Sequence, residues 1–251
     1  MNPYESDKLL GEYLLFHYGS HDEVLPWPDG PKAALEYPAR CVRECVDVLA
    51  LPPNARALDI GCAVGRSTFE LARHCAEAIG IDYSRRFIEV AQTLARDGSF
   101  PYLLADEGAL VTPLVAKVPA KIPRARVRFE HGDAQALRDS LGSFDLVLGA
   151  NLIDRLAHPA QFIAQLPRLV KPGGQLVLTS PYTWLADYTA ADEWIGGFLE
   201  NEKPRTTLDG LRAALGADFS LVATKDLPFL IREHARKFQW SVAQASIWRR
   251  K

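Results

Sequence analysis

The sequence predicts a single α/β domain, built on a mostly parallel sheet that carries helices on both faces. Three observations lead to this prediction. An apolar run at residues 57–60 passes through glycines into an amphipathic helical pattern, similar apolar runs alternate with helical patterns further on, and several of these runs end close to an acidic residue. With 251 residues, of which 48% are hydrophobic, the chain can bury one sizeable core. We therefore treat residues 1–251 as one domain.

Charge and composition exclude several classes of partner. The net charge is −2 and basic residues are scattered, so neither nucleic acid nor an anionic membrane is an expected partner. Apolar runs are much shorter than the roughly 20 residues of a membrane span, and the opening MNPYESDKLL is acidic where a signal peptide is basic. We expect a cytoplasmic protein. The four cysteines form no C-x-x-C pair, which favours buried free thiols over a metal site.

Residues 1–50 are predicted to form a helical cap. Apolar and aromatic side chains recur at helical spacing over residues 9–17, a proline-rich bend covers residues 26–31, and a second helical pattern spans residues 37–49. Helices placed before the first strand would lie across the carboxyl edge of the sheet, where open α/β folds bind their ligands.

Three residues of this cap are candidates for a substrate site. His17 and Tyr18 end the first helix just before Gly19, a residue that suits a helix stop. Each is either a packing and capping residue or a substrate ligand. Arg40, near the start of the second helix, either pairs with a carboxylate or is solvated.

The sequence ALDIGCAVGRSTFELA, from Ala57 to Ala72, reads as strand, tight turn and helix. Gly61 and Gly65 permit positive φ and a close approach of the backbone, and N–H groups at a helix start favour an anion or carboxylate. Ala63 occupies the second glycine position of the dinucleotide fingerprint. The remaining pattern, Asp59-x-Gly61-x-x-x-Gly65, resembles motif I of the class I S-adenosylmethionine-dependent methyltransferases. The resemblance implies a cofactor loop that also contains Cys62, and an ordinary βα turn is the alternative.

A second apolar run, AIGID, ends at Asp82 about 20 residues after the loop. A carboxylate there can accept hydrogen bonds from both hydroxyls of a ribose, because its two oxygens match a vicinal diol. The alternative is that Asp82 only caps the next helix, for which Ser84 is also a candidate N-cap. Tyr83 is expected to contact the adenine.

The proline-rich residues 98–126 interrupt the α/β rhythm and predict an insertion, either a hairpin or a helical unit. A third strand follows at residues 127–130. In the resembling family an acid after this strand accepts a hydrogen bond from the exocyclic amine of adenine. The matching residues are Asp133 and its neighbour Ala134, while a helix N-cap is the alternative for Asp133.

A nearly all-apolar strand at residues 144–149 is of the kind buried in a parallel sheet. The position after it faces the transferable methyl group in this architecture, which makes Asn151, Asp154 and Arg155 candidates for contact with the cofactor and the acceptor. The N-P-P-[YF] signature of nucleic-acid methylases is absent. After a helix through Leu169, the sequence LVKPGGQLVL is typical of the same methyltransferases and leads into a strand at residues 175–179.

An aromatic and acidic stretch at residues 181–205 is predicted to cover the substrate, with Tyr182 and Trp184 among the side chains that line it. A helix at residues 207–215 and strands at residues 219–224 and 238–248 follow. Residues 229–238 stand between these two strands.

These elements add up to a Rossmann-like, seven-stranded and mostly parallel sheet in the order 3-2-1-4-5-7-6, with the last strand antiparallel and an N-terminal helical cap. Motifs along the whole chain resemble one subfamily, the 4-mercaptohistidine (5-thiohistidine) N1-methyltransferases that usually form the C-terminal domain of ovothiol synthases. The motifs are NPYESDKLLGEYLLFHYGS, EVLPWPDGP, YPARCV, DIGCAVGR and FLIREHARKFQWSVAQASIWRR. The sequence shows no sulfoxide synthase domain, so the resemblance implies that a separate sulfoxide synthase supplies the amino acid substrate.

The implied reaction is methyl transfer from S-adenosylmethionine to an imidazole nitrogen of 5-thiohistidine, or of its selenium analogue. For control of the imidazole tautomer we predict Asp154, with His17 or Tyr18 as alternatives. For the substrate carboxylate we predict Arg155 or Arg40. The competing interpretations are a methyltransferase for another small amine, carboxylate or hydroxyl compound, and a non-catalytic module that binds S-adenosylmethionine.

Overall fold

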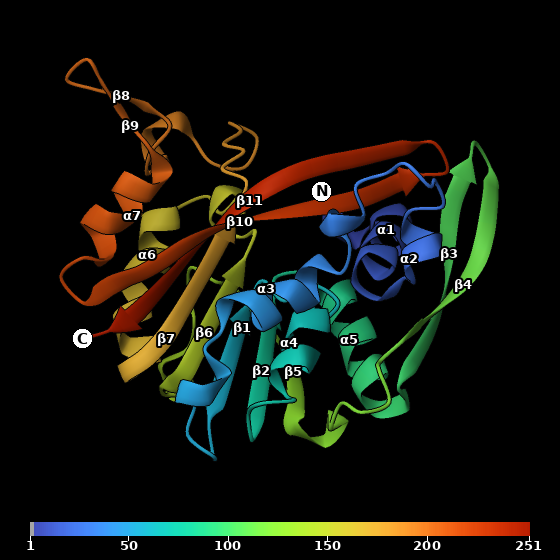
Figure 1. Cartoon of the computed structure of the whole chain (residues 1–251), viewed down its shortest axis with the longest axis horizontal. Coiled ribbons are helices and arrows are strands. Elements are labelled where there is room, and N and C mark those ends of the chain that lie inside the picture. Colours follow the sequence, from blue (N-terminus) through green and yellow to red (C-terminus); the bar gives the residue numbers. More distant parts are fainter. Residues whose placement is uncertain (1–2) are drawn as a thin grey trace.

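A seven-stranded sheet forms the centre of the protein in a computed structural model that describes residues 3–251 (Figure 1). Its strands are β1 (Arg56–Ile60), β2 (Glu77–Asp82), β5 (Val127–His131), β6 (Phe144–Ala150), β7 (Val170–Ser180), β10 (Phe219–His234) and β11 (Lys237–Arg250). The order β5-β2-β1-β6-β7-β11-β10, with β11 antiparallel to both of its neighbours, confirms the predicted topology. Met1 and Asn2 of the predicted cap lie outside the described residues.

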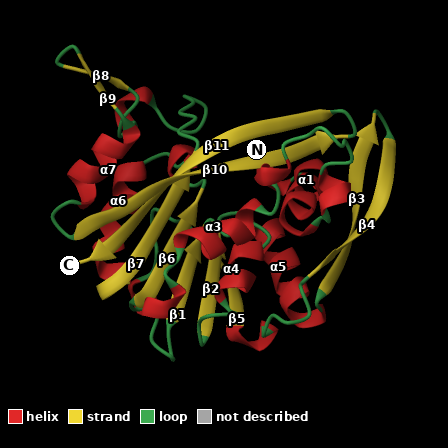
Figure 2. Cartoon of the chain, in the orientation of Figure 1, coloured by secondary structure: helices red, strands yellow, loops and turns green. Residues whose placement is uncertain are grey.

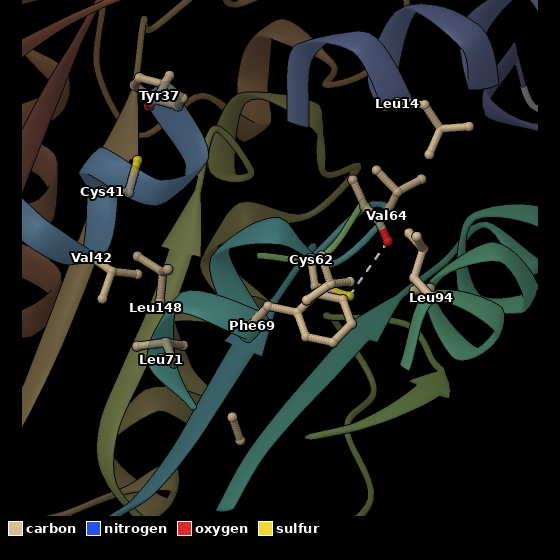
Figure 3. Close-up of a cluster of buried hydrophobic side chains, with 14 of the residues drawn as sticks. Leu14, Tyr37, Cys41, Val42, Cys62, Val64, Phe69, Leu71, Leu94 and Leu148 are labelled. Carbon is tan, nitrogen blue, oxygen red and sulfur yellow. Dashed lines mark hydrogen bonds between the residues drawn. The ribbon is translucent and has the colours of Figure 1, made fainter. Parts of the chain in front are cut away.

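Helices cover both faces of this sheet (Figure 2). One face packs against α3 (Tyr37–Cys45), α4 (Arg66–Leu71) and α5 (Arg85–Asp97), and the other against α6 (Pro159–Leu169) and α7 (Thr207–Leu215). Side chains alternate between the two cores along each strand, because successive residues of a strand point to opposite faces. In β6, Leu148 enters the first core and Val147 the second. Figure 3 shows part of the first core, to which α3 contributes Tyr37, Cys41 and Val42.

The N-terminal cap consists of α1 (Asp7–Tyr18), the short helix α2 (His21–Val24) and α3. Ser6 is the N-cap of α1 and accepts a hydrogen bond from the backbone N–H of Leu9 at 3.3 Å. The second predicted helix is shorter than expected, since it ends at Cys45 and a separate 3-10 turn follows at Val48–Ala50. The helix α1 packs against both β3 and β10, which fixes it beside the sheet.

Residues 98–126 contain a β-hairpin, one of the two forms expected there. Its strands are β3 (Ser99–Glu107) and β4 (Leu110–Lys117), and Gly108 lies in the turn with a φ of 56°. Tyr102, Leu104 and Ala116 are buried in the same core as α1. The hairpin therefore supports the outer side of the cap.

The prediction for the C-terminal strands was too short. Residues 229–238 are not a separate segment but the outer part of a ribbon, in which Phe229 pairs with Ser241 and Arg232 pairs with Phe238. The alternation of apolar and polar residues expected of a strand is interrupted here by charged residues, which make contacts outside the sheet. Arg232 donates a hydrogen bond to the Glu23 carbonyl at 2.6 Å and lies 3.5 Å from the Asp106 carboxylate. The ribbon thus reaches from the sheet to the cap and the hairpin (Figure 1).

A small hairpin, formed by β8 (Phe198–Glu200) and β9 (Lys203–Arg205), lies within the predicted covering segment at residues 181–205. The helix α7 spans the predicted residues 207–215. Throughout residues 3–251, every helix is too short or too polar to cross a lipid bilayer.

Candidate functional site

A cavity of about 490 Å³ opens where β1, β2 and β6 end, and α1 forms one of its walls. This is the size range of small-molecule sites, and the carboxyl edge of an open α/β sheet is where ligands bind. The predicted site residues that line it are His17, Gly61, Cys62, Asp82, Tyr83, Asp133, Ala134, Asn151 and Arg155. Seven others lie outside its lining, namely Tyr18, Arg40, Asp59, Gly65, Asp154, Tyr182 and Trp184.

The loop from Gly61 to Gly65 turns sharply from β1 into α4. Three of its residues have positive φ, which is 74° at Gly61, 48° at Ala63 and 88° at Gly65. A Cβ on Gly65 would come within 2.4 Å of the Phe129 ring, so this glycine packs the loop against β5 instead of lining the cavity. Ala63 accepts a left-handed backbone and donates its N–H to Asp82 Oδ2 at 2.8 Å. The loop is therefore tied to the end of β2.

Asp59 lies behind this loop and is fully buried. Its Oδ2 accepts hydrogen bonds from the hydroxyls of Ser67 and Thr68, both at 2.6 Å, while Oδ1 has no partner among the described residues. Burial raises the pKa of this carboxyl to about 6. Asp59 thus holds the first turn of α4, and the prediction that it contacts the cofactor directly does not agree with its position.

Asp82 faces the cavity at the end of β2. Its Oδ1 accepts the Ser84 N–H at 2.8 Å and its Oδ2 accepts the Ala63 N–H, and each oxygen keeps a further lone pair. Ser84 is the N-cap of α5, because its hydroxyl accepts the Phe87 N–H at 3.1 Å. Because Ser84 caps α5, the capping alternative does not explain why the Asp82 carboxylate faces the cavity. Burial raises the pKa of its carboxyl.

Asp133 and Ala134 follow β5 and line the same cavity. Asp133 Oδ1 accepts the Gln135 backbone N–H at 2.8 Å, and no helix begins at this residue, which removes the N-cap alternative. Tyr83 is 63% exposed, and its ring centroid lies 6.0 Å from that of His131. These residues form one end of the cavity.

Asn151 follows β6 with a φ of 50°, a conformation that asparagine tolerates better than most residues. Its side-chain oxygen accepts a hydrogen bond from the Tyr37 hydroxyl at 2.6 Å, and the Thr179 hydroxyl lies 3.2 Å from the same oxygen. The side chain thereby joins the cap to the carboxyl ends of β6 and β7.

Asp154 and Arg155 form an ion pair, with 3.1 Å between Asp154 Oδ2 and Arg155 Nη1. The two side chains lie in different environments. Asp154 is fully buried, and its oxygens accept hydrogen bonds from Ser180 Oγ at 2.9 Å and the Thr183 N–H at 3.1 Å. It therefore fixes the turn after β7, and it lies outside the cavity lining, where the predicted contact with an acceptor would have to be made. Arg155 lines the cavity, and its guanidinium lies 4.9 Å from the centroid of the Tyr188 ring.

His17 lines the cavity from α1, and its Nδ1 accepts the backbone N–H of Arg66 at 3.4 Å. Burial, together with the Arg66 cation, lowers the pKa of His17 to about 3, so the ring is neutral. With Nδ1 as the acceptor, Nε2 carries the hydrogen. Tyr18 instead donates its hydroxyl to the Val64 carbonyl at 2.7 Å and anchors α1 on the loop.

Three predicted substrate residues serve other contacts. Arg40 donates to Glu44 Oε1 at 2.5 Å and to the Pro228 carbonyl at 3.0 Å, which joins α3 to β10. Tyr182 donates its hydroxyl to Gln244 at 3.0 Å, and Trp184 donates to the Thr207 hydroxyl at 2.9 Å. From the segment 181–205, the residues that reach the cavity are Asp187 and Tyr188.

Sequence reasoning missed most of the aromatic wall, which consists of Tyr4, Tyr13, Phe16, Tyr37 and Tyr188. A signal was present in α1, because Tyr13, Phe16 and His17 stand at i, i+3 and i+4 and so share one face. Of this face, only His17 was predicted to reach a substrate. Cys62 also lines the cavity as a buried thiol whose pKa is raised by burial.

No group of three or more metal-binding side chains is found within residues 3–251. All four cysteines are free and buried.

Residues 58–178 match a family described as a methyltransferase domain. The ubiquinone biosynthesis O-methyltransferase of Methylococcus capsulatus is 26% identical over 175 residues, which are 69% of this chain and 63% of that protein. The O-methyltransferase cnsE of Penicillium expansum is 26% identical over 238 residues, 92% of this chain and 74% of that protein. This chain thus matches less than two thirds of the length of the Methylococcus capsulatus protein.

Among solved structures, the N-methyltransferase NodS of Bradyrhizobium japonicum, in complex with S-adenosyl-L-homocysteine, shares the fold. The TM-score is 0.54 at 17% identity, over 96% of this chain and 98% of that one. The match of residues 58–178, together with the sheet order and the glycine-bearing loop, supports a class I S-adenosylmethionine-dependent methyltransferase domain. The likeness to NodS shows the same fold.

Proposed function

We propose that the protein transfers a methyl group from S-adenosylmethionine to an imidazole ring nitrogen of 5-thiohistidine, or of its selenium analogue, in ovothiol-type biosynthesis. The observation that carries this proposal is the composition of the cavity. The lining combines the strand-end carboxylates of Asp82 and Asp133 with aromatic rings and with Arg155, which is the one arginine or lysine among the described lining residues. Such a chamber suits a planar ring that bears a carboxylate.

The carboxylate end of the cavity fits the nucleoside of the cofactor. Asp82 offers a free lone pair on each oxygen to the two ribose hydroxyls, and Asp133 keeps Oδ2 available for an amine of adenine. The backbone of Gly61 to Ala63 is left for the methionine end. This assignment uses four of the predicted cofactor residues that line the cavity, namely Gly61, Cys62, Asp82 and Asp133.

The aromatic end fits the acceptor. The rings of Phe16 and Tyr37 have centroids 5.9 Å apart, and that of Tyr13 lies 6.5 Å from Phe16. Flat faces of this kind pack well against an imidazole. Arg155 provides charge-assisted hydrogen bonds for the carboxylate of an amino acid. A separate sulfoxide synthase would then supply the substrate, and the free thiols favour a reducing, cytoplasmic location.

The reaction is an in-line displacement. The lone pair of the ring nitrogen forms the new N–CH₃ bond while the S–CH₃ bond of the sulfonium breaks, and its electron pair stays on sulfur. Because the sulfonium is already a good leaving group, the protein contributes mainly alignment and exclusion of water. The aromatic wall and the cap provide both.

The experiment is incubation of the protein with S-adenosylmethionine and, in parallel, 5-thiohistidine, histidine, ergothioneine and a phenolic acceptor. We expect a mass gain of one methyl on 5-thiohistidine alone, placed on a ring nitrogen by NMR. Because two relatives bear the name O-methyltransferase, methylation of the phenol alone would replace this proposal with an O-methyltransferase. Cofactor binding without turnover on any acceptor would indicate a non-catalytic module.

A further inference from the structure

The side-chain amide of Asn151 is held so that only its N–H groups remain available. Its oxygen accepts from the Tyr37 hydroxyl at 2.6 Å, and the Thr179 hydroxyl lies within 3.2 Å of it. Tyr37 is 2% exposed and Thr179 is 1% exposed, so water does not compete for this oxygen. No residue in the described part of the chain accepts a hydrogen bond from the amide nitrogen. Asn151 lines the cavity and therefore offers it donors.

Arg155 adds further donors from the same turn. Its Nη1 is occupied by the Asp154 carboxylate and by the carbonyls of Asp154 and Thr183, at 2.9–3.1 Å. Its Nε and Nη2 have no hydrogen-bond acceptor within residues 3–251. The turn that follows β6 thus presents unpaired N–H groups from two side chains to one cavity.

The histidine and the buried tyrosines of the lining do not provide a base. His17 has Nδ1 occupied by the Arg66 N–H and already carries a hydrogen on Nε2, and burial lowers its pKa to about 3. The pKa values of Tyr4, Tyr13 and Tyr37 are raised by burial, so these hydroxyls keep their protons.

The carboxylates of this region are committed or peripheral. Asp154 is buried outside the cavity lining, Asp187 lines the cavity but is exposed, and Asp82 is bound to two backbone N–H groups. Apart from the exposed Asp187, a neutral acceptor that must lose a proton therefore finds no uncommitted carboxylate among the described lining residues near Arg155.

We propose that Asn151 is a specificity-determining residue, whose amide N–H groups bind an anionic atom of the acceptor. The proposal rests on the proposed function and deepens it: the anionic atom is the thiolate sulfur of 5-thiohistidine, or the selenolate of its analogue. Donors without acceptors favour an anion over a neutral isostere, because each N–H then makes a charge-assisted hydrogen bond.

Charge balance explains why no base is needed. The acceptor enters as a neutral imidazole with a thiolate, and the sulfonium carries one positive charge. Formation of the N–CH₃ bond moves this positive charge onto the ring, where the thiolate compensates it, and the ring N–H keeps its proton. Histidine would instead yield an uncompensated imidazolium in a buried site beside Arg155, which is unfavourable. The chamber thus selects the sulfur-bearing ring.

The test measures the thiol pKa of 5-thiohistidine by ultraviolet absorbance, free and bound to the protein with S-adenosylhomocysteine. We expect binding to lower this pKa by at least one unit. Asn151→Asp, which replaces the donors with a carboxylate, should abolish the shift and reduce kcat/KM about 100-fold, while S-adenosylhomocysteine affinity stays within threefold. Tyr37→Phe, which frees the amide to turn its oxygen to the cavity, should lose part of the shift.

Asn201→Asp is the matched control, because Asn201 also has a φ of 50° but lies exposed between β8 and β9. It should leave both measurements unchanged. A thiol pKa that is unshifted on binding, or equally shifted in Asn151→Asp, overturns the inference even if 5-thiohistidine is methylated. A shifted pKa without methyl transfer leaves the anion subsite in place and overturns the proposed function. No binding of 5-thiohistidine overturns both.

Discussion

At the scale of the residue, the buried Asp59 carboxyl holds the start of α4 in place, but its ionised form destabilises the folded protein. One of its oxygens holds the hydroxyls of Ser67 and Thr68, while the other is buried without a partner. The charged form is therefore poorly compensated, and burial raises the folded-state pKa from 3.8 to about 6. Asp59 is thus a residue whose ionisation costs stability.

We predict that Asp59→Asn removes a pH dependence. Because the folded pKa lies above the unfolded one, the native state binds the proton more tightly, and its stability falls as pH rises from about 4 to 6. Asparagine can still accept both hydroxyl hydrogen bonds but does not ionise. The free energy of unfolding of the variant, relative to wild type, should rise by about 2 kcal/mol between pH 4 and pH 7.

Urea denaturation of both proteins without cofactor, from pH 4 to pH 8, measures this difference. His17 acts in the opposite sense, since its pKa is lowered to about 3 and its folded state is destabilised by acid. His17 is present in both proteins, so subtraction removes its contribution. Stability curves that run parallel across this pH range would show that the Asp59 carboxyl is compensated.

Some residues of the site could be predicted from the sequence and others could not. Asp82 and Asp133 were found because they follow parallel strands, whose carboxyl ends meet at one edge. Asp154 stands in a similar sequence context yet faces away from the cavity. The turn before it passes through the left-handed conformation of Asn151, and such a backbone reversal cannot be read from residue types. The direction in which a side chain points after such a turn could therefore not be predicted from the sequence.

At the scale of the element, α1 depends on one close contact with the hairpin. A Cβ on Gly11 would come within 2.6 Å of the backbone carbonyl oxygen of Leu103 in β3. This separation is much shorter than a normal contact, and neither backbone can move freely, because Leu103 pairs with Pro113 in the hairpin. Glycine at this position thus sets the distance between α1 and β3.

We predict that Gly11→Ala destabilises the protein by about 1–3 kcal/mol, the usual cost of overpacking. Helix propensity alone predicts the opposite, a gain of about 1 kcal/mol. The clash should also displace Tyr13, Phe16 and His17, so affinity for S-adenosylhomocysteine should fall. Thermal denaturation and calorimetry measure the two effects. A variant that is more stable than wild type would mean that α1 and the hairpin adapt without cost.

Elements were predictable where local pattern and burial agreed. The strand–loop–helix unit around Gly61 and the helix at residues 207–215 follow from periodicity alone. The outer half of the β10–β11 ribbon did not, because it leaves the sheet and packs on α1 and β3 instead of alternating between core and solvent. Contacts between segments far apart in the sequence decided its length.

At the scale of the whole molecule, two distant segments close one cavity. Tyr4, Tyr13 and His17 approach from the N-terminal cap, while Asp187 and Tyr188 approach from the segment before β8. Arg155 lies between them and stacks on Tyr188. A ligand in the cavity therefore contacts both segments at once, and its binding energy should stabilise them together.

We predict that S-adenosylhomocysteine slows amide hydrogen exchange in residues 4–18 and 185–195 together, although these segments are remote in the chain. At a ligand concentration 100 times the dissociation constant, binding stabilises the liganded state by about 2.7 kcal/mol, which bounds the protection expected. The β8–β9 hairpin lies off the cavity lining and should exchange as before. Protection restricted to residues 61–66 and 82–84 would show that the cofactor binds without the two covering segments, and that these close only over the acceptor.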